Sequence, residues 1–139
     1  MKESLQAGLE HSFSFKVDES KLVPALFPEA EEFGVMPRVF ATGYLVGLVE
    51  WACIQAINPH IDWPAEQTVG TRVELSHEAA TPPGFAVTVK VNLVAVEGRK
   101  LTFAVEARDN QDVISRGTHQ RYVINKEKFD AGLKKKIES

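Results

Sequence analysis

Apolar and polar residues divide this chain into one long apolar run and several alternating segments. Residues 39–57, VFATGYLVGLVEWACIQAI, are almost entirely apolar and contain no proline. An ideal helix of this length spans about 28 Å. A helix that is apolar on every side is either buried on every side or lies in lipid. This run therefore predicts a long helix around which the other elements are arranged.

Five further segments alternate between apolar and polar residues, which is the pattern of a half-buried β-strand. They cover residues 9–17, 68–79, 85–96, 99–108 and 113–124. Short turn sequences rich in proline, glycine or aspartate separate the later segments. The end of the chain, from residue 126 to 137, predicts a polar helix.

Within residues 68–79 the alternation separates an apolar face from a polar face. The apolar face holds Val69, Thr71, Val73, Leu75, His77 and Ala79. His77 is therefore expected to point inward, although its neighbours in the sequence point outward. Gly117 lies at the middle of the last strand, where a glycine often marks the close approach of another backbone.

The order of these elements predicts an α+β fold. One strand precedes the long helix, and four antiparallel strands follow it. We expect a curved antiparallel sheet of about five strands wrapped around the central helix, with residues 1–139 forming a single domain. One sheet leaves part of such a helix uncovered, so a second copy of the chain is the expected cover.

Composition and charge exclude several classes of partner. The net charge of −3 gives no basic field for nucleic acid, so no nucleic-acid partner is expected. Cys53 is the single cysteine, which rules out an intrachain disulfide and fits a reducing, cytoplasmic location. The first residues lack the apolar core of a signal peptide. His11, His60 and His119 show no ligand spacing, so no metal site is expected.

The long apolar run also carries the first candidate for chemistry. Its strongly polar side chains are Thr42, Glu50 and Gln55. Glu50 and Gln55, together with the strand-like segments that follow, argue against a membrane span. A carboxylate inside a buried helix costs several kcal/mol unless it is paired or protonated, so Glu50 needs an explanation. Thr42 and His77 have ordinary alternatives, since a threonine at a helix start often caps it and a histidine in a core is often only hydrogen-bonded.

Four stretches of the sequence resemble the fluoroacetyl-CoA thioesterase family. They are VFATGYLVGLVEWAC, VGTRVELSHEAATPPG, the turn VEGRKL, and the end GTHQRYVINKEKF. The resemblance runs from about residue 13 to residue 129. It implies a hot-dog fold and the hydrolysis of a short-chain acyl-CoA, fluoroacetyl-CoA among the candidates, to the free acid and CoA. It implies no cofactor, since coenzyme A is part of the substrate.

The resemblance also implies roles for individual residues. The positions of the family's catalytic threonine, glutamate and histidine are occupied here by Thr42, Glu50 and His77. The family's glycine near the substrate carbonyl is matched by Gly70, and its arginine facing the acyl pocket by Arg121.

The family's lid carries two phenylalanines over the acyl pocket. Phe33 matches the first, whereas Met36 stands where the family has the second. This departure leaves the catalytic set intact and bears on the discrimination of a fluorinated acyl group. Methionine is flexible and polarizable, so the lid is expected to admit several small acyl chains.

Helix geometry separates two of the candidate catalytic residues. Thr42 and Glu50 are eight residues apart, which places them about 80° apart around the helix axis and about 12 Å apart along it. They are too far apart to hydrogen-bond within one helix. We therefore expect a homodimer in which two such helices lie side by side and build two composite sites, with a tetramer as the larger alternative.

Two other functions remain open from the sequence. The first is a non-catalytic module that binds or senses acyl-CoA, although a mere binder has no need of a buried acid. The second is a dehydratase or isomerase of the same fold, which the threonine disfavours. Within the hydrolase interpretation, either Thr42 or Glu50 is the nucleophile.

Overall fold

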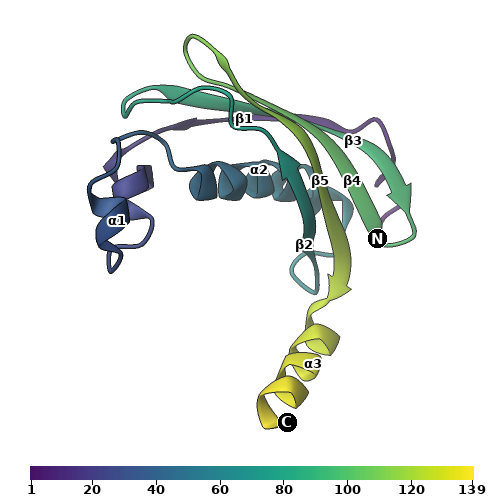
Figure 1. The fold of residues 1–139 in the computed structure, drawn as a ribbon. Coiled ribbons are helices and arrows are strands. Elements are labelled where there is room, and N and C mark those ends of the chain that lie inside the picture. The colour runs from purple at the N-terminus through teal and green to yellow at the C-terminus, as the bar shows by residue number, and fades with distance from the viewer.

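The computed structural model describes residues 1–139 and consists of one curved sheet with a long helix in its hollow (Figure 1). The helix is α2, Thr42–Ile57. The strands are β1 (Glu10–Lys16), β2 (Glu66–Leu75), β3 (Ala86–Glu97), β4 (Lys100–Arg108) and β5 (Val113–Asn125). The predicted five strands and central helix are thus confirmed.

The sheet has the strand order β1-β3-β4-β5-β2, and every neighbouring pair is antiparallel. β1 and β2 are therefore its two edges. The short helix α1 (Glu31–Gly34) and three 3-10 turns, Glu19–Lys21, Val23–Ala25 and Asn58–His60, lie in the connections. The C-terminal helix α3 (Lys126–Glu138) continues from β5 and projects away from the sheet (Figure 1).

The long helix begins at Thr42, three residues later than the apolar run suggested. Ala41 before it is extended, with φ −74° and ψ 140°. The backbone N–H of Phe40 donates to the carbonyl of Thr81 at 2.8 Å, and that of Ala41 donates to the carbonyl of Lys21 at 3.0 Å. The carbonyl of Val39 accepts from the backbone N–H of Val23 at 2.9 Å, and Phe40 pairs with Leu22 in an isolated β-bridge. Residues 39–41 therefore run as an extended segment instead of a first helical turn.

β2 departs from the predicted alternation in two ways. It ends at Leu75, so His77 lies beyond the strand. Its register with β5 also shifts, because Gly70 lies opposite Arg121 whereas Arg72 lies opposite Gln120. The extra residue between them is a β-bulge, which breaks the period of two.

The bulge decides which residues of β2 face the helix. Directly opposed residues of an antiparallel pair share a face. Gly70 and Val73 lie opposite Arg121 and His119, which are two residues apart on β5. Gly70 therefore shares the inner face with Val73, and the prediction that Val69 does so is wrong.

The core fills the space between α2 and the hollow face of the sheet. It is a cluster of 21 buried apolar residues. From the helix come Leu45, Val49, Ala52 and Cys53, among others. Facing them from the strands are Val87, Val89, Val91, Leu93 and Phe103. This packing fixes α2 against the sheet along most of its length.

One side of α2 is only partly covered within the chain, by Leu26 next to Gly43 and by Phe13 of β1 next to Trp51. Gly43, Gly47 and Trp51 follow one another at every fourth residue, and all three are exposed.

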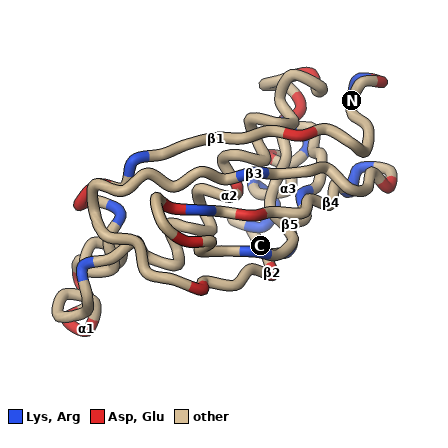
Figure 2. Tube along the Cα trace, turned by 90° about the horizontal axis from the view of Figure 1, so that it is seen from above, with Lys and Arg blue, Asp and Glu red and all other residues tan.

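Charged residues of both signs are spread along the trace (Figure 2). None of the helices is both long enough and apolar enough to cross a membrane.

Gly117 is required by the close approach of β2, and its replacement by alanine should destabilise the fold. Its φ is +154°, and an added Cβ would lie 1.9 Å from the carbonyl oxygen of Glu74. We expect Gly117→Ala to lower the free energy of unfolding by about 2 kcal/mol or more, measured by urea denaturation. Gly132→Ala is the matched control, because nothing lies within 4 Å of its added Cβ in α3. Equal stability of the two variants would contradict this account.

Candidate functional site

The first cluster of predicted site residues joins the start of α2 to the segment after β2. The hydroxyl oxygen Oγ1 of Thr42 lies 2.8 Å from Nδ1 of His77. Thr42 is the first residue of the helix, and the preceding Ala41 makes no side-chain cap. The Thr42 hydroxyl is therefore not used as a helix cap, and it is free to bond to the imidazole.

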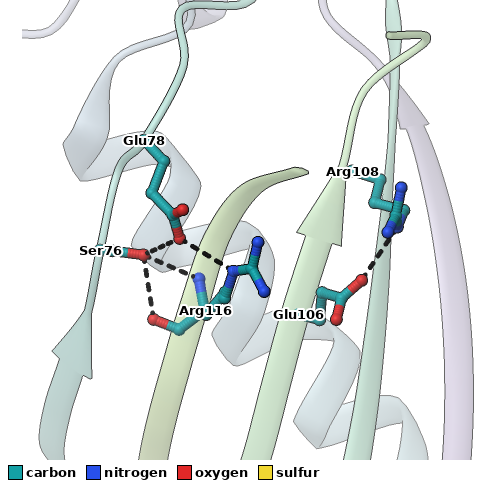
Figure 3. Close-up of polar contacts among 5 residues, drawn as sticks. All are labelled: Ser76, Glu78, Glu106, Arg108 and Arg116. Carbon is teal, nitrogen blue, oxygen red and sulfur yellow. Dashed lines mark hydrogen bonds and ion pairs between the residues drawn. The ribbon is translucent and has the colours of Figure 1, made fainter. Parts of the chain in front are cut away.

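A polar network on the outer surface holds the backbone on either side of His77 (Figure 3). The Ser76 hydroxyl donates to Oε2 of Glu78 at 2.7 Å and accepts from the backbone N–H of Arg116 at 3.0 Å. Nε of Arg116 also lies 3.3 Å from the same Glu78 oxygen. These exposed contacts are worth little stability individually, but together they clamp the residues before and after His77 to β5.

Backbone bonds extend this clamp past the end of β2. The N–H of Ser76 donates to the Arg116 carbonyl at 2.9 Å, and that of Glu78 donates to the Ile114 carbonyl at 2.7 Å. Figure 3 also shows the neighbouring pair Glu106–Arg108 on β4. With both neighbours turned outward, the His77 side chain points inward to Thr42.

Burial lowers the pKa of His77 below its ordinary value of 6.5. The imidazole is therefore neutral at pH 7, and Nδ1 can accept the Thr42 hydroxyl proton. Nε2 then carries the ring proton. Nε2 is buried and has no hydrogen-bond partner within the chain. It is therefore free to donate a hydrogen bond to a group outside this chain.

The second cluster centres on Arg121, whose side chain is 4% exposed. Its Nη1 lies 2.9 Å from Oε1 of Glu50. Its Nε donates to the Thr68 hydroxyl and its Nη2 to the Thr68 carbonyl, both at 2.8 Å. The buried guanidinium explains the carboxylate in the apolar helix, since each charge partners the other.

His119 completes this cluster and was not among the predicted site residues. It is fully buried on β5, two residues before Arg121. Its Nε2 lies 3.1 Å from Nη1 of Arg121, and its Nδ1 lies 2.8 Å from the backbone carbonyl of Arg72. The spacing of two along one strand was the available signal, because it places both side chains on the same face.

Gly70 makes room for this arrangement. A Cβ at this position would lie 2.6 Å from Oε1 of Glu50 and 3.4 Å from Nη1 of Arg121. The absence of a side chain lets the carboxylate and guanidinium meet beside the β2 backbone. Oε2 of Glu50 makes no hydrogen bond within the chain, and the Glu50 side chain is 38% exposed.

The two clusters do not meet within one chain. No hydrogen bond or ion pair links Thr42 or His77 to Glu50 or Arg121.

Cys53, one turn beyond Glu50, is buried, and burial raises the pKa of its thiol to about 12. This thiol is therefore protonated and unreactive at neutral pH.

An open pocket of about 310 Å³ lies beside the first cluster. Its lining includes Thr42 and His77 together with Val39, Phe40 and Ala79. The two lid residues do not line it.

The lid residues belong to the connection between β1 and α2. Phe33 lies in α1 and stacks on Phe27, with ring centroids 5.8 Å apart. Met36 follows α1 and is 46% exposed.

No group of three or more histidine, cysteine, aspartate or glutamate residues is placed to hold a metal ion.

Comparison with known proteins gives a consistent match over almost the whole chain. The family model of the fluoroacetyl-CoA-specific thioesterases matches residues 24–127. A curated fluoroacetyl-CoA thioesterase from Streptantibioticus cattleyicolor is 46% identical over 136 residues, covering 98% of this chain and 97% of that protein.

Solved structures agree with the sequence match. A structure of the fluoroacetyl-CoA thioesterase FlK superposes with a TM-score of 0.92 at 46% identity, covering 95% of this chain and 97% of that chain. A hot-dog-like protein from Thermanaerovibrio acidaminovorans superposes with a TM-score of 0.79 at 18% identity, covering 94% and 91%. The second likeness concerns the fold alone, and it identifies the sheet and helix described above as a hot-dog fold.

The half-buried His77 and the buried His119 should make stability depend on pH. Burial lowers the pKa of both His77 and His119 below 6.5. Just below pH 6.5 the two histidines bind protons in the unfolded chain but not in the folded chain. The free energy of unfolding therefore increases as the pH rises through this range, and this stabilisation is lost as the pH falls. Urea denaturation at pH 5 to 7.5 measures this slope. Replacing both histidines with glutamine should flatten it, and an unchanged slope would contradict the assignment.

Proposed function

The chain belongs to the fluoroacetyl-CoA-specific thioesterase family, and we propose that it hydrolyses a short-chain acyl-CoA to the free acid and CoA with Thr42, His77 and Glu50. The observation that carries this proposal is the 2.8 Å contact between the Thr42 hydroxyl and the His77 imidazole. A hydroxyl is a weak nucleophile that needs an adjacent base, and a neutral imidazole is that base.

The three side chains can divide the work of thioester hydrolysis. His77 removes the Thr42 proton and returns a proton to the sulfur of CoA when the carbon–sulfur bond breaks. Oε1 of Glu50 is fixed by Arg121, which leaves Oε2 to act on a water or on the acyl carbon. Attack by Thr42 and attack by Glu50 therefore both use the same set of residues.

The start of α2 supplies donors for the charge that develops on the thioester oxygen. The N–H groups of the first helical residues, Thr42 and Gly43, have no partner inside a helix. They lie beside the Thr42 hydroxyl and carry the positive end of the helix dipole. We propose that Gly70, next to Glu50, contacts the substrate carbonyl from the other side.

We propose further that each site is shared between two copies of the chain. Thr42 and His77 form one half, and Glu50 and Gly70 form the other half. Nε2 of His77 and Oε2 of Glu50 both lack partners within the chain. The exposed stripe at Gly43, Gly47 and Trp51 offers a close-packing face for a second α2, and β2 is an unpaired sheet edge.

Such a homodimer places two equivalent composite sites between the helices, and a tetramer would be two such dimers. Coenzyme A enters as part of the substrate, and no cofactor is required. The free thiol of Cys53 fits the reducing cytosol.

For the acyl group we propose a lid made by Phe33 and Met36, in which the flexible Met36 admits several small acyl chains.

A thiol-release assay over acetyl-, fluoroacetyl-, propionyl-, butyryl- and longer acyl-CoAs tests the reaction. Wild-type protein should release CoA from short-chain substrates. Glu50→Gln should lower turnover by about a hundredfold or more, because it removes the charge that acts on water or carbon. The chain-length profile reports what the Met36 lid admits.

Glu74→Gln is the matched control for this assay. Glu74 lies on β2, is exposed, and pairs only with Arg72, so its replacement should leave turnover unchanged. If folded wild-type protein turns over none of the substrates, the chain is the alternative, a binding or sensing module for acyl-CoA. Loss of an enoyl absorbance without thiol release would indicate a dehydratase or isomerase.

Mixing two inactive variants tests the composite site. Thr42→Ala and Glu50→Gln protomers are each inactive alone, but a mixed dimer contains one intact site. Random exchange makes half of the dimers mixed, so the mixture should recover about a quarter of the wild-type rate. Activity is measured after mixed unfolding and refolding, together with the molar mass by light scattering.

The control mixture pairs Thr42→Ala with His77→Ala. Both residues belong to the same half-site, so no mixed dimer regains an intact site and the rate should stay at background. Recovery in the control, absence of recovery in the test mixture, or a monomeric wild type would overturn the shared site.

A further inference from the structure

His119 is a buried histidine to which the reaction above gives no role. It has 0% of its surface exposed, and it contacts the guanidinium that holds Glu50. We propose that His119 is a positioning residue: as an Nδ1-protonated neutral imidazole, it fixes the Arg121 guanidinium and thereby aims the Glu50 carboxylate. This inference rests on the proposed function, because the carboxylate it aims is the proposed catalytic one.

The partners of His119 determine where its proton lies. The Arg72 carbonyl, 2.8 Å from Nδ1, can only accept a hydrogen bond, so Nδ1 carries the proton. Nη1 of Arg121, 3.1 Å from Nε2, can only donate, so Nε2 is bare. A doubly protonated ring would point an N–H at the guanidinium and break this contact.

The contacts of Arg121 show why this acceptor matters. Nε and Nη2 are held by Thr68, and Nη1 donates to both Glu50 and His119. The two hydrogens of Nη1 therefore have one acceptor each. Without the imidazole acceptor, one buried N–H of Arg121 is left unsatisfied, and the Nη1 end of the guanidinium keeps only its bond to Glu50.

The groups around His119 set its protonation. Arg121 lies on the same strand and Glu50 faces it from α2. Its directly opposed neighbours are Phe103 on β4 and Val73 on β2, and neither is titratable. Burial is the main cause that lowers the pKa of His119, and the charge of Arg121 lowers it further, whereas the bond to Arg72 and the charge of Glu50 raise it.

Two substitutions separate positioning from packing. His119→Gln can place an amide oxygen near the position of Nε2 and keep the acceptor for Arg121. His119→Asn reaches only the position of Nδ1 and loses that acceptor. Both remove the ring, so a merely structural role predicts similar losses of stability and activity for the two variants.

The expected result is a difference between the variants in kcat. Because misplacing a catalytic group by about 1 Å costs about a hundredfold, His119→Asn should lose about that factor in kcat with little change in KM. His119→Gln should retain kcat within about tenfold of wild type. Thermal unfolding checks that both are folded, and His60→Gln, whose ring bonds to Ser4, is the control for losing a histidine elsewhere.

The pH profile and the ring itself give two further readouts. The acidic limb of the kcat profile should contain one protonation fewer in His119→Gln than in wild type, namely that of His119. Nitrogen NMR of the wild-type ring should show a protonated Nδ1 and a bare Nε2 at pH 7. Equal loss of kcat in both variants, or a ring that is protonated at Nε2, would overturn the inference.

The NMR measurement keeps this inference separate from the proposed function. If wild-type protein turns over no acyl-CoA, the proposed function fails, and the ring tautomer still decides whether His119 holds Arg121. If the enzyme is active and the two variants lose activity equally, the hydrolase stands and the positioning role fails.

Discussion

The polar cluster between α2 and strands β2 and β5 depends on one buried cation, the guanidinium of Arg121. Arg121 lies under α2 with almost no exposed surface, and an unpaired buried charge costs several kcal/mol. Glu50, His119 and both polar groups of Thr68 surround it. The acid in the helix, the histidine on β5 and the glycine on β2 are therefore parts of one electrostatic arrangement.

The second half of the site is built by backbone geometry more than by charge. Residues 39–41 are extended because Phe40 pairs with Leu22 and the Val39 carbonyl accepts from Val23. The helix therefore starts at Thr42, whose hydroxyl lies beside the His77 imidazole. His77 in turn is held by backbone bonds and by the Ser76, Glu78 and Arg116 network. Each half is held by hydrogen bonds of its own, and the proposed dimer requires only that the two halves meet.

Periodicity alone predicted the strands and the central helix, because each is long and strongly patterned. It failed at residues 39–41, where tertiary hydrogen bonds replace a helical turn, and at Thr71, where a bulge reverses the alternation. Glu50 could be singled out as the one ionisable side chain in the apolar run, although its expected burial is only partial in this chain, where the side chain is 38% exposed. Its partner Arg121 came only from a family resemblance, because a contact between a helix and a strand far apart in the sequence leaves no local signal. His119 was taken for a residue without a ligand role, although its spacing of two from Arg121 on one strand places both side chains on the same face.

The bulge in β2 makes the length of that strand part of the chemistry. Without the bulge, the same residues would pair regularly with β5, and Arg72 would move from its place opposite Gln120 to a place opposite His119. Every residue of β2 after Thr71 would then exchange faces, so that Val73 would leave the inner face and the segment that carries His77 would turn with it. The one extra residue thus sets which side chains after it face the helix, so the number of residues in this segment matters as well as their identity.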